Sequence, residues 1–342
     1  MASISAKWWK YDLQFKRPAG TSRGVLNAKP SYFIELTLDG VTGRGECPII
    51  PKLSLDDRPG FGDALTQLCE ELQASGQVAF NQWSDWPAIQ FGLEQCFADI
   101  LRQKQGRKVW LDSPWARGEC GMPINGLIWM GDSCFMAEEA ERRLAEGFQC
   151  IKMKVGALDF ATELAHLTDL RHAAGPDQLE LRVDANGGFT SDEIGEVIDQ
   201  LAQFQLHSIE QPLKPSDIQG LKALAATSPI PIALDESLIG VNTGAERDAL
   251  LDEIQPQYIV IKPSLLGGLA QAEDWIQRAR QRGIGYWVTS ALESNWGLAW
   301  IAQWAATLPD LGGHQGFGTG SLYTNNLPPM TEVRQGEIWS LS

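Results

Sequence analysis

The stretch CIKMKVG, from Cys150 to Gly156, reads as a short β-strand that carries two lysines among apolar neighbours. Successive side chains of a strand point to opposite faces. Lys152 and Lys154 therefore share one face, and the isoleucine, methionine and valine share the other. Ammonium groups are costly to bury unless they are paired or functional. The stretch predicts a strand that packs one face against helices and turns the other toward a polar site.

Five later segments also read as strands that end in a polar residue, and in four of them this residue lies opposite its apolar neighbours. Counted from Lys154, the intervals between these residues are 30, 26, 25, 27 and 28 positions. A strand, a helix and two loops need about that length, so each interval is one βα unit. With further strands near GMPINGLIWMG and GGHQGFGTG, the repeat predicts an α/β fold that closes into a parallel (β/α) barrel. The polar residues are Asp184, Glu210, Asp235, Lys262 and Ser290.

The first part of the chain, residues 1–110, has a different rhythm. KWWKYDLQF and PSYFIELTLDGVTGRGEC read as strands of a meander, with Asp39-Gly40 as a turn, and two segments of helical spacing follow. Strand and helix alternate only after this α+β segment. We therefore expect a smaller domain over 1–110 and a barrel over 111–319.

Composition narrows the class of protein. The 342 residues are 44% hydrophobic and carry a formal net charge of −15, which disfavours a nucleic-acid partner. There is no apolar run long enough for a membrane span and no signal-like N-terminus, and the six cysteines form no CxxC pair. We expect a cytoplasmic globular protein without a membrane or nucleic-acid partner; the sequence leaves the oligomeric state open.

The charged strand ends should meet at the carboxyl mouth of the barrel, where active sites of this fold lie. A single such residue is more often a solvated rim residue, but five consecutive strands with matching polar ends indicate a site. Asp184, Glu210 and Asp235 form a hard oxygen donor set, which predicts one divalent cation, Mg²⁺ or in its place Mn²⁺. No cysteine or histidine stands at these positions, which disfavours zinc.

A lysine acts as a base at neutral pH only when its ammonium form is destabilised. For Lys154, the like charge of Lys152 and a nearby metal ion are two available causes. A lysine base beside Mg²⁺ suits removal of a proton α to a carboxylate, with the metal stabilising the resulting enediolate. These residues therefore predict a small anionic carboxylate as the substrate.

The motifs KMK, VDAN, IEQP, LDES and IKPS resemble those of the enolase superfamily over most of the chain. The resemblance implies a modified (β/α)7β TIM-type barrel and an N-terminal α+β capping domain that the tail, residues 320–342, completes. It also implies that Lys154 is the base and then the acid, that Lys262 stabilises the enediolate from the opposite face, and that Lys152 assists Lys154. Asn186 and Glu236 would support the metal ligands.

Further features resemble the muconate-lactonizing subgroup, and within it the branch that serves menaquinone biosynthesis. They are GRGECPIIPKLS in the cap, TSALESNWG after the seventh strand and GTGSLYTNN near the end. This resemblance implies dehydration of 2-succinyl-6-hydroxy-2,4-cyclohexadiene-1-carboxylate to o-succinylbenzoate, a hydro-lyase reaction. The segment GTSRG is a candidate lid. The candidate substrate-binding residues are Arg23, Ser264, Gly267 and Ser290.

Two alternatives stay open on the same framework. An N-acylamino acid racemase or dipeptide epimerase would use Lys154 and Lys262 as bases on opposite faces. The Asp-x-Asp pair of the dipeptide epimerases is replaced by HQGFGTG at the last strand. A barrel that only binds an acidic metabolite is the other alternative, and retention of all the charged positions speaks against it.

Overall fold

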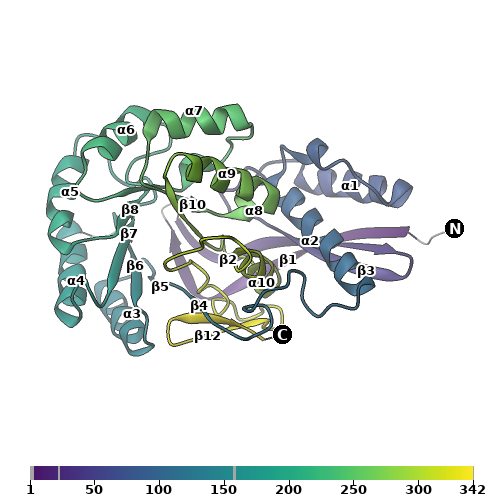
Figure 1. Cartoon of the computed structure of the whole chain (residues 1–342), viewed down its shortest axis with the longest axis horizontal. Coiled ribbons are helices and arrows are strands. Elements are labelled where there is room, and N and C mark those ends of the chain that lie inside the picture. Colours follow the sequence, from purple (N-terminus) through teal and green to yellow (C-terminus); the bar gives the residue numbers. More distant parts are fainter. Residues whose placement is uncertain (1–3, 22–23, 157–158, 342) are drawn as a thin grey trace.

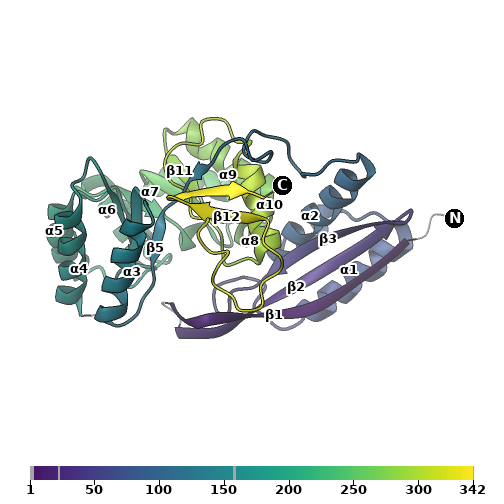
Figure 2. The same cartoon turned by 90° about the horizontal axis from the view of Figure 1, so that it is seen from below.

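The structure is a computed structural model that describes residues 4–21, 24–156 and 159–341. Three long antiparallel strands open the chain, β1 (Ile4–Thr21), β2 (Gly24–Leu38) and β3 (Val41–Pro48), in the order β1-β2-β3. Asp39 and Gly40 join β2 to β3 with φ of 55° and 80°, as the predicted Asp-Gly turn requires. Figure 2 shows these strands as an elongated layer with α1 (Phe61–Ser75) and α2 (Pro87–Lys104) on one side.

The layer of β1, β2 and β3 has its own apolar core. Leu65 and Leu68 of α1 and Leu93 of α2 are fully buried against Ile34 and Leu36 of β2. Between β3 and α2 the backbones lie so close that a Cβ at Gly45 would stand 1.8 Å from the carbonyl oxygen of Gly92. Glycine is therefore required at this crossing, because no side chain fits there.

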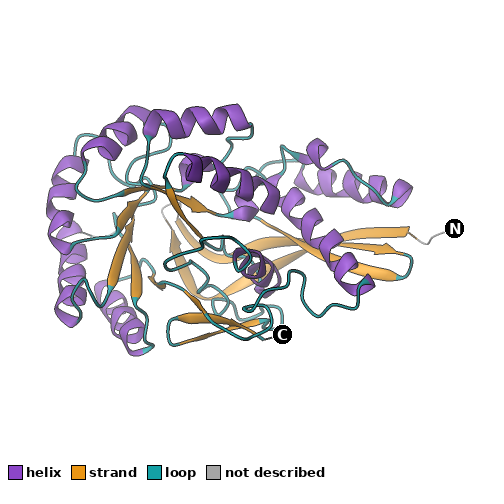
Figure 3. Cartoon of the chain, viewed as in Figure 1, coloured by secondary structure: helices purple, strands orange, loops and turns teal. Residues whose placement is uncertain are grey.

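A second sheet of parallel strands carries the alternating part of the chain. Within the described residues its order is β11-β10-β9-β8-β7-β6-β5, and every neighbouring pair is parallel. Helices alternate with the strands and follow the outer side of the sheet (Figures 1 and 3). The strands are β5 (Gly126–Ile128), β6 (Cys150–Lys154), β7 (Glu180–Asp184), β8 (Ser208–Glu210), β9 (Ile232–Leu234), β10 (Tyr258–Ile261) and β11 (Gly285–Val288). The helices are α3 (Ser133–Ala145), α4 (Phe160–Ala173), α5 (Ile194–Leu201), α6 (Ile218–Thr227), α7 (Gly244–Ile254), α8 (Pro263–Leu266), α9 (Leu269–Gln281) and α10 (Asn295–Ala305).

Residues near Gln315 close the sheet. Gln315 forms a parallel bridge with Ile124 just before β5, and Gly316 forms one with Thr289 just after β11. The predicted last strand in GGHQGFGTG therefore links the two edges of the parallel sheet. The prediction of a TIM-type barrel with an N-terminal capping layer is confirmed.

The C-terminal residues form a third sheet. Strands β12 (Thr331–Arg334) and β13 (Glu337–Ser340) pair with β4 (Met122–Pro123) in the order β12-β13-β4. On the way there, Tyr323 forms a bridge with Phe15 of β1. The tail thus contacts the capping layer before it pairs with β4, and the domain boundaries given above stay predictions. In the described parts of the chain, no helix has the length and apolarity needed to cross a bilayer.

Replacement of Gly45 by alanine tests the close packing of β3 on α2. We expect Gly45→Ala to lower the free energy of unfolding by about 3 kcal/mol, because either the strand or the helix must shift. The matched control is Gly195→Ala in α5, where an added Cβ meets nothing within 4 Å. That control should leave stability unchanged or raise it by up to about 1 kcal/mol. Equal stabilities of the two variants in urea unfolding would contradict the prediction.

Candidate active site

The strand register places the predicted charged residues side by side. Lys154 at the end of β6 pairs with Asp184 at the end of β7, and Asp184 pairs with Glu210 at the end of β8. Glu210 pairs with Ala233, so Asp235 lies two residues further on and on the same face. The alternation of side chains along each strand predicted this arrangement. The carboxyl ends of successive strands bring these side chains to one mouth.

The amines of the mouth lie among its carboxylates. Lys152 Nζ is 2.8 Å from Glu210 Oε2 and 3.4 Å from Asp184 Oδ2. Lys154 Nζ is 3.0 Å from Asp184 Oδ2 and donates a hydrogen bond of 2.5 Å to Asn186 Oδ1. Lys262 reaches the site from the other side, where it donates to Asp235 and stands 3.9 Å from Glu210 Oε1. Lys154 and Lys262 therefore approach the carboxylates from separate strands, β6 and the end of β10.

Burial makes these contacts necessary. Burial raises the pKa of Glu210 to about 7, and the negative charge of Asp184 acts in the same direction. Burial also opposes ionisation of Asp184, but the ammonium groups of Lys154 and Lys152 outweigh it and hold the pKa of Asp184 well below its usual range. For Lys262, burial would lower the pKa, and the carboxylates of Asp235 and Glu210 raise it instead. The mouth is a set of mutually compensating charges.

The carboxylates fit a hard divalent cation by their chemistry. Asp184, Glu210 and Asp235 each expose 2% or less of their surface, and all come from neighbouring strand ends. Glu210 Oε1 is buried and accepts no hydrogen bond, and the amine of Lys262 stands 3.9 Å from it. The three carboxylates do not close to within 4.8 Å of one another in this structure, because the lysine amines lie between them. The sequence predicted that these three carboxylates would converge on one point, but in the structure they form ion pairs with the lysine amines instead.

Asn186 and Glu236, the predicted supports of the metal ligands, line the pocket together with Asp184. Asn186 has a left-handed φ of 46°, which lets its backbone N–H donate to Asp184 Oδ1 over 3.1 Å. Its side-chain amide donates to Glu236 Oε1 over 3.1 Å while its oxygen accepts from Lys154. Asn186 therefore connects the proposed base to two acidic residues.

Sequence reasoning missed Gln211. This fully buried residue follows Glu210, and its Oε1 accepts from the backbone N–H groups of Asp235 and Ser237 at 3.0 and 3.1 Å. Its Nε2 donates to Leu213 O and Ser237 Oγ. Gln211 thus positions the turn that carries Asp235. The motif IEQP contains the glutamine, but its contacts with the next strand could not be read from the sequence.

A pocket lies above the charged residues, and the capping layer contributes to it. Its lining includes Lys154, Lys262 and Asn186 from the barrel and Ile50 and Leu53 from the segment after β3. Gly20, the first residue of the candidate lid, forms a bridge with Met130 just after β5. Arg23, in the same lid segment, falls outside the described residues.

The predicted substrate-binding residues differ in whether they line this pocket. Ser290 lines the pocket, whereas Ser264 and Gly267 do not. Ser264 is 1% exposed, and its hydroxyl donates to Glu293 over 2.5 Å. Gly267 lies beside the side chain of Gln90. The roles of Ser264 and Gly267 in substrate binding stay predictions.

Glu293 holds this wall from behind. It accepts from Ser290 Oγ over 2.6 Å and from Ala291 N over 2.8 Å. Ser290 Oγ in turn accepts from Thr319 Oγ1 over 2.8 Å. Leu292 N also donates to Ser290 Oγ, over 3.1 Å, so the hydroxyl hydrogen and both lone pairs of Ser290 already have partners within the protein.

A buried polar connection joins the capping layer to the barrel. Lys29 of β2 is fully buried and donates to Ser31 Oγ over 3.1 Å, and Ser31 donates to Glu46 Oε1 over 2.7 Å. Glu46 of β3 accepts at the N-terminus of α10, from both the N–H and the hydroxyl of Ser294. Burial lowers the pKa of Lys29, and the carboxylates of Glu46 and Glu293 oppose this shift. Lys29 is thus a buried cation between an acid of the cap and an acid behind the pocket wall.

Comparisons with known proteins agree with this architecture. A family model described as Enolase C-terminal domain-like matches residues 135–340. An o-succinylbenzoate synthase of Desulfotalea psychrophila is 46% identical, over 98% of this chain and 99% of the relative. The crystal structure of MenC from Desulfotalea psychrophila has a TM-score of 0.85 at 42% identity and covers 98% of this chain and 99% of that one. An L-Ala-D/L-Glu epimerase of Bacillus subtilis is 26% identical, over 85% of this chain and 81% of the relative.

A capped parallel barrel with lysines and carboxylates at its mouth, matched by the family model, defines an enzyme of the enolase superfamily. Within that superfamily, the chain belongs to the family of the o-succinylbenzoate synthases. The family resemblance read from the motifs is confirmed.

The buried cation predicts a strong effect of Lys29→Met. We expect the free energy of unfolding to fall by about 3 kcal/mol at pH 7, because two buried carboxylates lose their neighbouring charge. Burial raises the pKa of Glu293, so protonation of this group favours the folded chain. The difference in unfolding free energy between the unaltered chain and Lys29→Met should therefore become smaller as the pH falls from 7 toward about 4.3, the ordinary pKa of a glutamate side chain.

The control for this variant is Lys7→Met. Lys7 forms an ion pair of 2.8 Å with Glu35, but its side chain is 70% exposed. Its loss should cost less than about 1 kcal/mol. Urea unfolding of both variants between pH 5 and 7 measures the difference. A deficit for Lys29→Met that is small, or that grows in acid, would contradict the role of Lys29.

Proposed function

We propose that this chain dehydrates 2-succinyl-6-hydroxy-2,4-cyclohexadiene-1-carboxylate to o-succinylbenzoate, the hydro-lyase reaction of menaquinone biosynthesis. The observation that carries the proposal is the placement of Lys154 and Lys262 on separate sides of one carboxylate-lined pocket. The 46% identity to an o-succinylbenzoate synthase over nearly the whole chain supports the assignment of the reaction.

Lys154 is the base in this proposal. Its amine removes the proton on the carbon next to the substrate carboxylate, and the electron pair of that C–H bond moves onto this carboxylate to give the enediolate. The ammonium then gives the proton to the leaving hydroxyl on the same face. As the C–O bond breaks, the electron pair returns to the ring as a double bond, so that water departs and the ring becomes aromatic. Asn186, which accepts from Lys154 Nζ over 2.5 Å, holds the amine in place. Proton transfer by one positioned group in both steps keeps the balance of protons within the site.

Lys262 and Lys152 supply fixed positive charge. The carboxylates of Asp235 and Glu210 raise the pKa of Lys262, so this ammonium stays charged on the face opposite Lys154. It stabilises the second negative charge that develops on the substrate carboxylate when the proton leaves. Glu210 and Asp184 raise the pKa of Lys152 against the effect of burial, and this second ammonium tunes its neighbour Lys154.

Asp184, Glu210 and Asp235 are the proposed ligands of Mg²⁺, or of Mn²⁺ in its place. When bound, the ion supplies a charge that neutralises the substrate carboxylate and lowers the cost of removing its α proton. In the absence of substrate, the lysine amines compensate the same carboxylates. Asn186 and Glu236 hold the ligand set from behind, and Gln211 fixes the turn of Asp235.

The capping layer excludes water from the reacting carbon. Ile50 and Leu53 cover the pocket from the cap, and Leu292 adds an apolar wall from the barrel. Ser290 lines the pocket and is a proposed contact of the substrate. Arg23 is the proposed partner of the succinyl carboxylate on the ground of its charge. The cytoplasm is the proposed location, where the small anionic substrate is made and used.

A racemase or epimerase of N-acyl amino acids or dipeptides is the second candidate. It is favoured by the presence of two pocket lysines on separate strands, since a racemase needs a base on each face. Relatives named as epimerases are more distant, at 26% identity for the Bacillus subtilis protein. The two reactions differ in outcome, because the dehydration releases water and the racemisation only inverts a carbon.

The dehydration assay tests the first proposal directly. Purified protein with Mg²⁺ should convert the cyclohexadiene substrate to an aromatic product, and Lys154→Ala should lower kcat by about 100- to 10,000-fold. The control is Lys222→Ala, because Lys222 is a half-exposed lysine on α6 that pairs with Glu253. N-succinyl amino acids in D₂O serve as the parallel substrate. Racemisation without any dehydration would replace the first proposal by the second, and full activity of Lys154→Ala would refute the base.

Removal of the metal gives an independent test. A chelator should abolish turnover, and Mg²⁺ should restore it and also raise the melting temperature, since a ligand that binds only the folded chain stabilises it. Asp235→Asn should weaken both effects. Turnover that survives exhaustive chelation would contradict the proposed metal site.

A further inference from the structure

A second group of ligand-type side chains lies at the opposite end of the barrel strands. Cys150 and Glu180 are the first residues of β6 and β7 and are register partners, whereas the mouth residues Lys154 and Asp184 are the last. Four residues of strand separate the two pairs by about 13 Å. His314 joins the group from the segment that closes the barrel. The group is thus separate from the proposed catalytic site and contains none of its residues.

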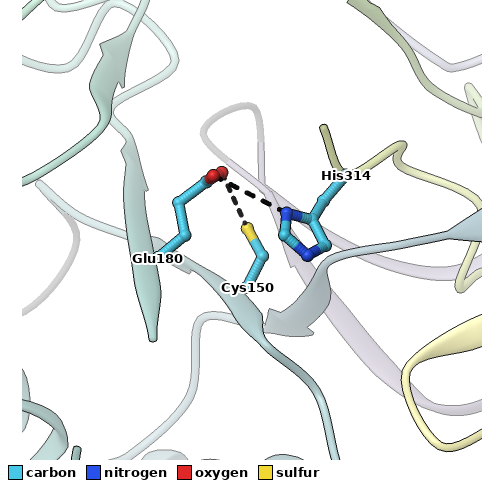
Figure 4. Close-up of side chains that lie close together, drawn as sticks. All are labelled: Cys150, Glu180 and His314. Carbon is cyan, nitrogen blue, oxygen red and sulfur yellow. Dashed lines mark hydrogen bonds and ion pairs between the residues drawn. The ribbon is translucent and has the colours of Figure 1, made fainter. Parts of the chain in front are cut away.

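The three side chains converge on one point. Figure 4 shows the thiol of Cys150 and the imidazole of His314 directed at the carboxylate of Glu180. Cys150 Sγ is 3.3 Å from Glu180 Oε1, and His314 Nδ1 is 3.6 Å from Glu180 Oε2. One ligand atom from each residue lies within 4.8 Å of the other two. Among the described residues, this is the group of three that meets that limit.

These separations are those of a tetrahedral metal site. Zinc binds sulfur at about 2.3 Å and imidazole nitrogen or carboxylate oxygen at about 2.1 Å. With tetrahedral angles, the ligand atoms then stand about 3.4 to 3.6 Å apart. Cys150 Sγ lies 3.3 Å from Glu180 Oε1, where zinc ligation needs about 3.6 Å, and His314 Nδ1 lies 3.6 Å from Oε2, where it needs about 3.4 Å. The side chains need little movement to hold such an ion.

His314 provides a separate observation. Its Nδ1 is buried but has no hydrogen-bond partner, because the Glu180 oxygen that it faces is 3.6 Å away. A buried polar atom without a partner is costly. An ion bonded to both this nitrogen and the carboxylate would remove that cost.

Arg182 is an adverse charge in direct contact with the group, and its contacts hold it to one side. Its guanidinium donates to Glu180 Oε1 over 2.7 Å and to His314 O over 3.0 Å, and it lies 4.4 Å from the centroid of the Trp287 ring. Glu180 Oε2 remains directed at the imidazole. A surface depression whose lining includes Arg182, His207 and Gly313 lies next to the group.

We propose that Cys150, Glu180 and His314 form a structural zinc site at the base of the barrel. Binding of Zn²⁺ replaces the thiol proton, which passes to solvent, by a bond between sulfur and the metal. A thiolate, an imidazole and a carboxylate together select zinc, whereas the all-oxygen set at the mouth selects magnesium. The ion would tie His314 to β6 and β7, next to the point where Gln315 and Gly316 close the barrel through single bridges.

Cobalt titration tests the site because sulfur ligation of Co²⁺ has its own charge-transfer absorption in the near ultraviolet. Metal-free protein is first saturated with Mg²⁺ and then titrated with Co²⁺. One equivalent should produce the sulfur-to-cobalt band, and Zn²⁺ should displace it. The mouth contains no cysteine among its predicted ligands, so cobalt bound there gives no such band.

Three variants decide which thiol is involved. Cys150→Ser should abolish the band, and His314→Asn should weaken cobalt affinity by about 10- to 100-fold while the circular dichroism spectrum is retained. Cys134→Ser is the matched control, because Cys134 is an exposed cysteine on α3. Absence of the band in the unaltered protein, its survival in Cys150→Ser or its loss in Cys134→Ser would overturn the proposal. His314→Asn, on a partly exposed residue, keeps the test valid if Cys150→Ser fails to fold.

Discussion

The pairing of buried ammonium groups with buried carboxylates is the interaction on which the barrel mouth depends. Neither partner is stable there alone, because removal of water from a single charge costs several kcal/mol. Lys152 and Lys154 are balanced by Asp184 and Glu210, and Lys262 by Asp235. Because the lysine amines occupy the space between the carboxylates, the proposed metal ion would have to displace their ion pairs when it binds.

The same strands explain how much of this could be predicted. Alternation along CIKMKVG and VDAN assigned each charged residue to the inner face, and the interval of 25 to 30 residues predicted the barrel. These are local properties of β-strands, so the sequence contains them. The insertion of the amines between the acids could not be predicted, because it depends on side-chain distances across three strands. The hydrogen bond from Ser264, a residue of α8, to Glu293 could not be predicted for a related reason, because the two residues are 29 positions apart.

Contacts between the capping layer and the barrel were beyond the reach of any local pattern. Glu46 and Ser294 are 248 positions apart and meet only because β3 packs against the start of α10. A carboxylate at a helix N-terminus is stabilised by the free backbone N–H groups and the helix dipole. This contact orients α10 and the preceding turn, in which Ser290 and Glu293 form the pocket wall. The cap thus acts on the site through buried hydrogen bonds as well as by covering it.

The two ends of the parallel strands show why one fold can separate stability from chemistry. At the carboxyl ends, β6 and β7 present Lys154 and Asp184, which belong to the compensating charges of the mouth. At the amino ends, the same two strands present Cys150 and Glu180, and Glu180 pairs with Arg182 as well as with His314. Since the strands between these ends are packed by fully buried apolar residues, a change at the base reaches the mouth only by moving whole strands. The amino-terminal end of the barrel can therefore acquire ligands that strengthen the barrel closure while the chemistry at the mouth stays the same.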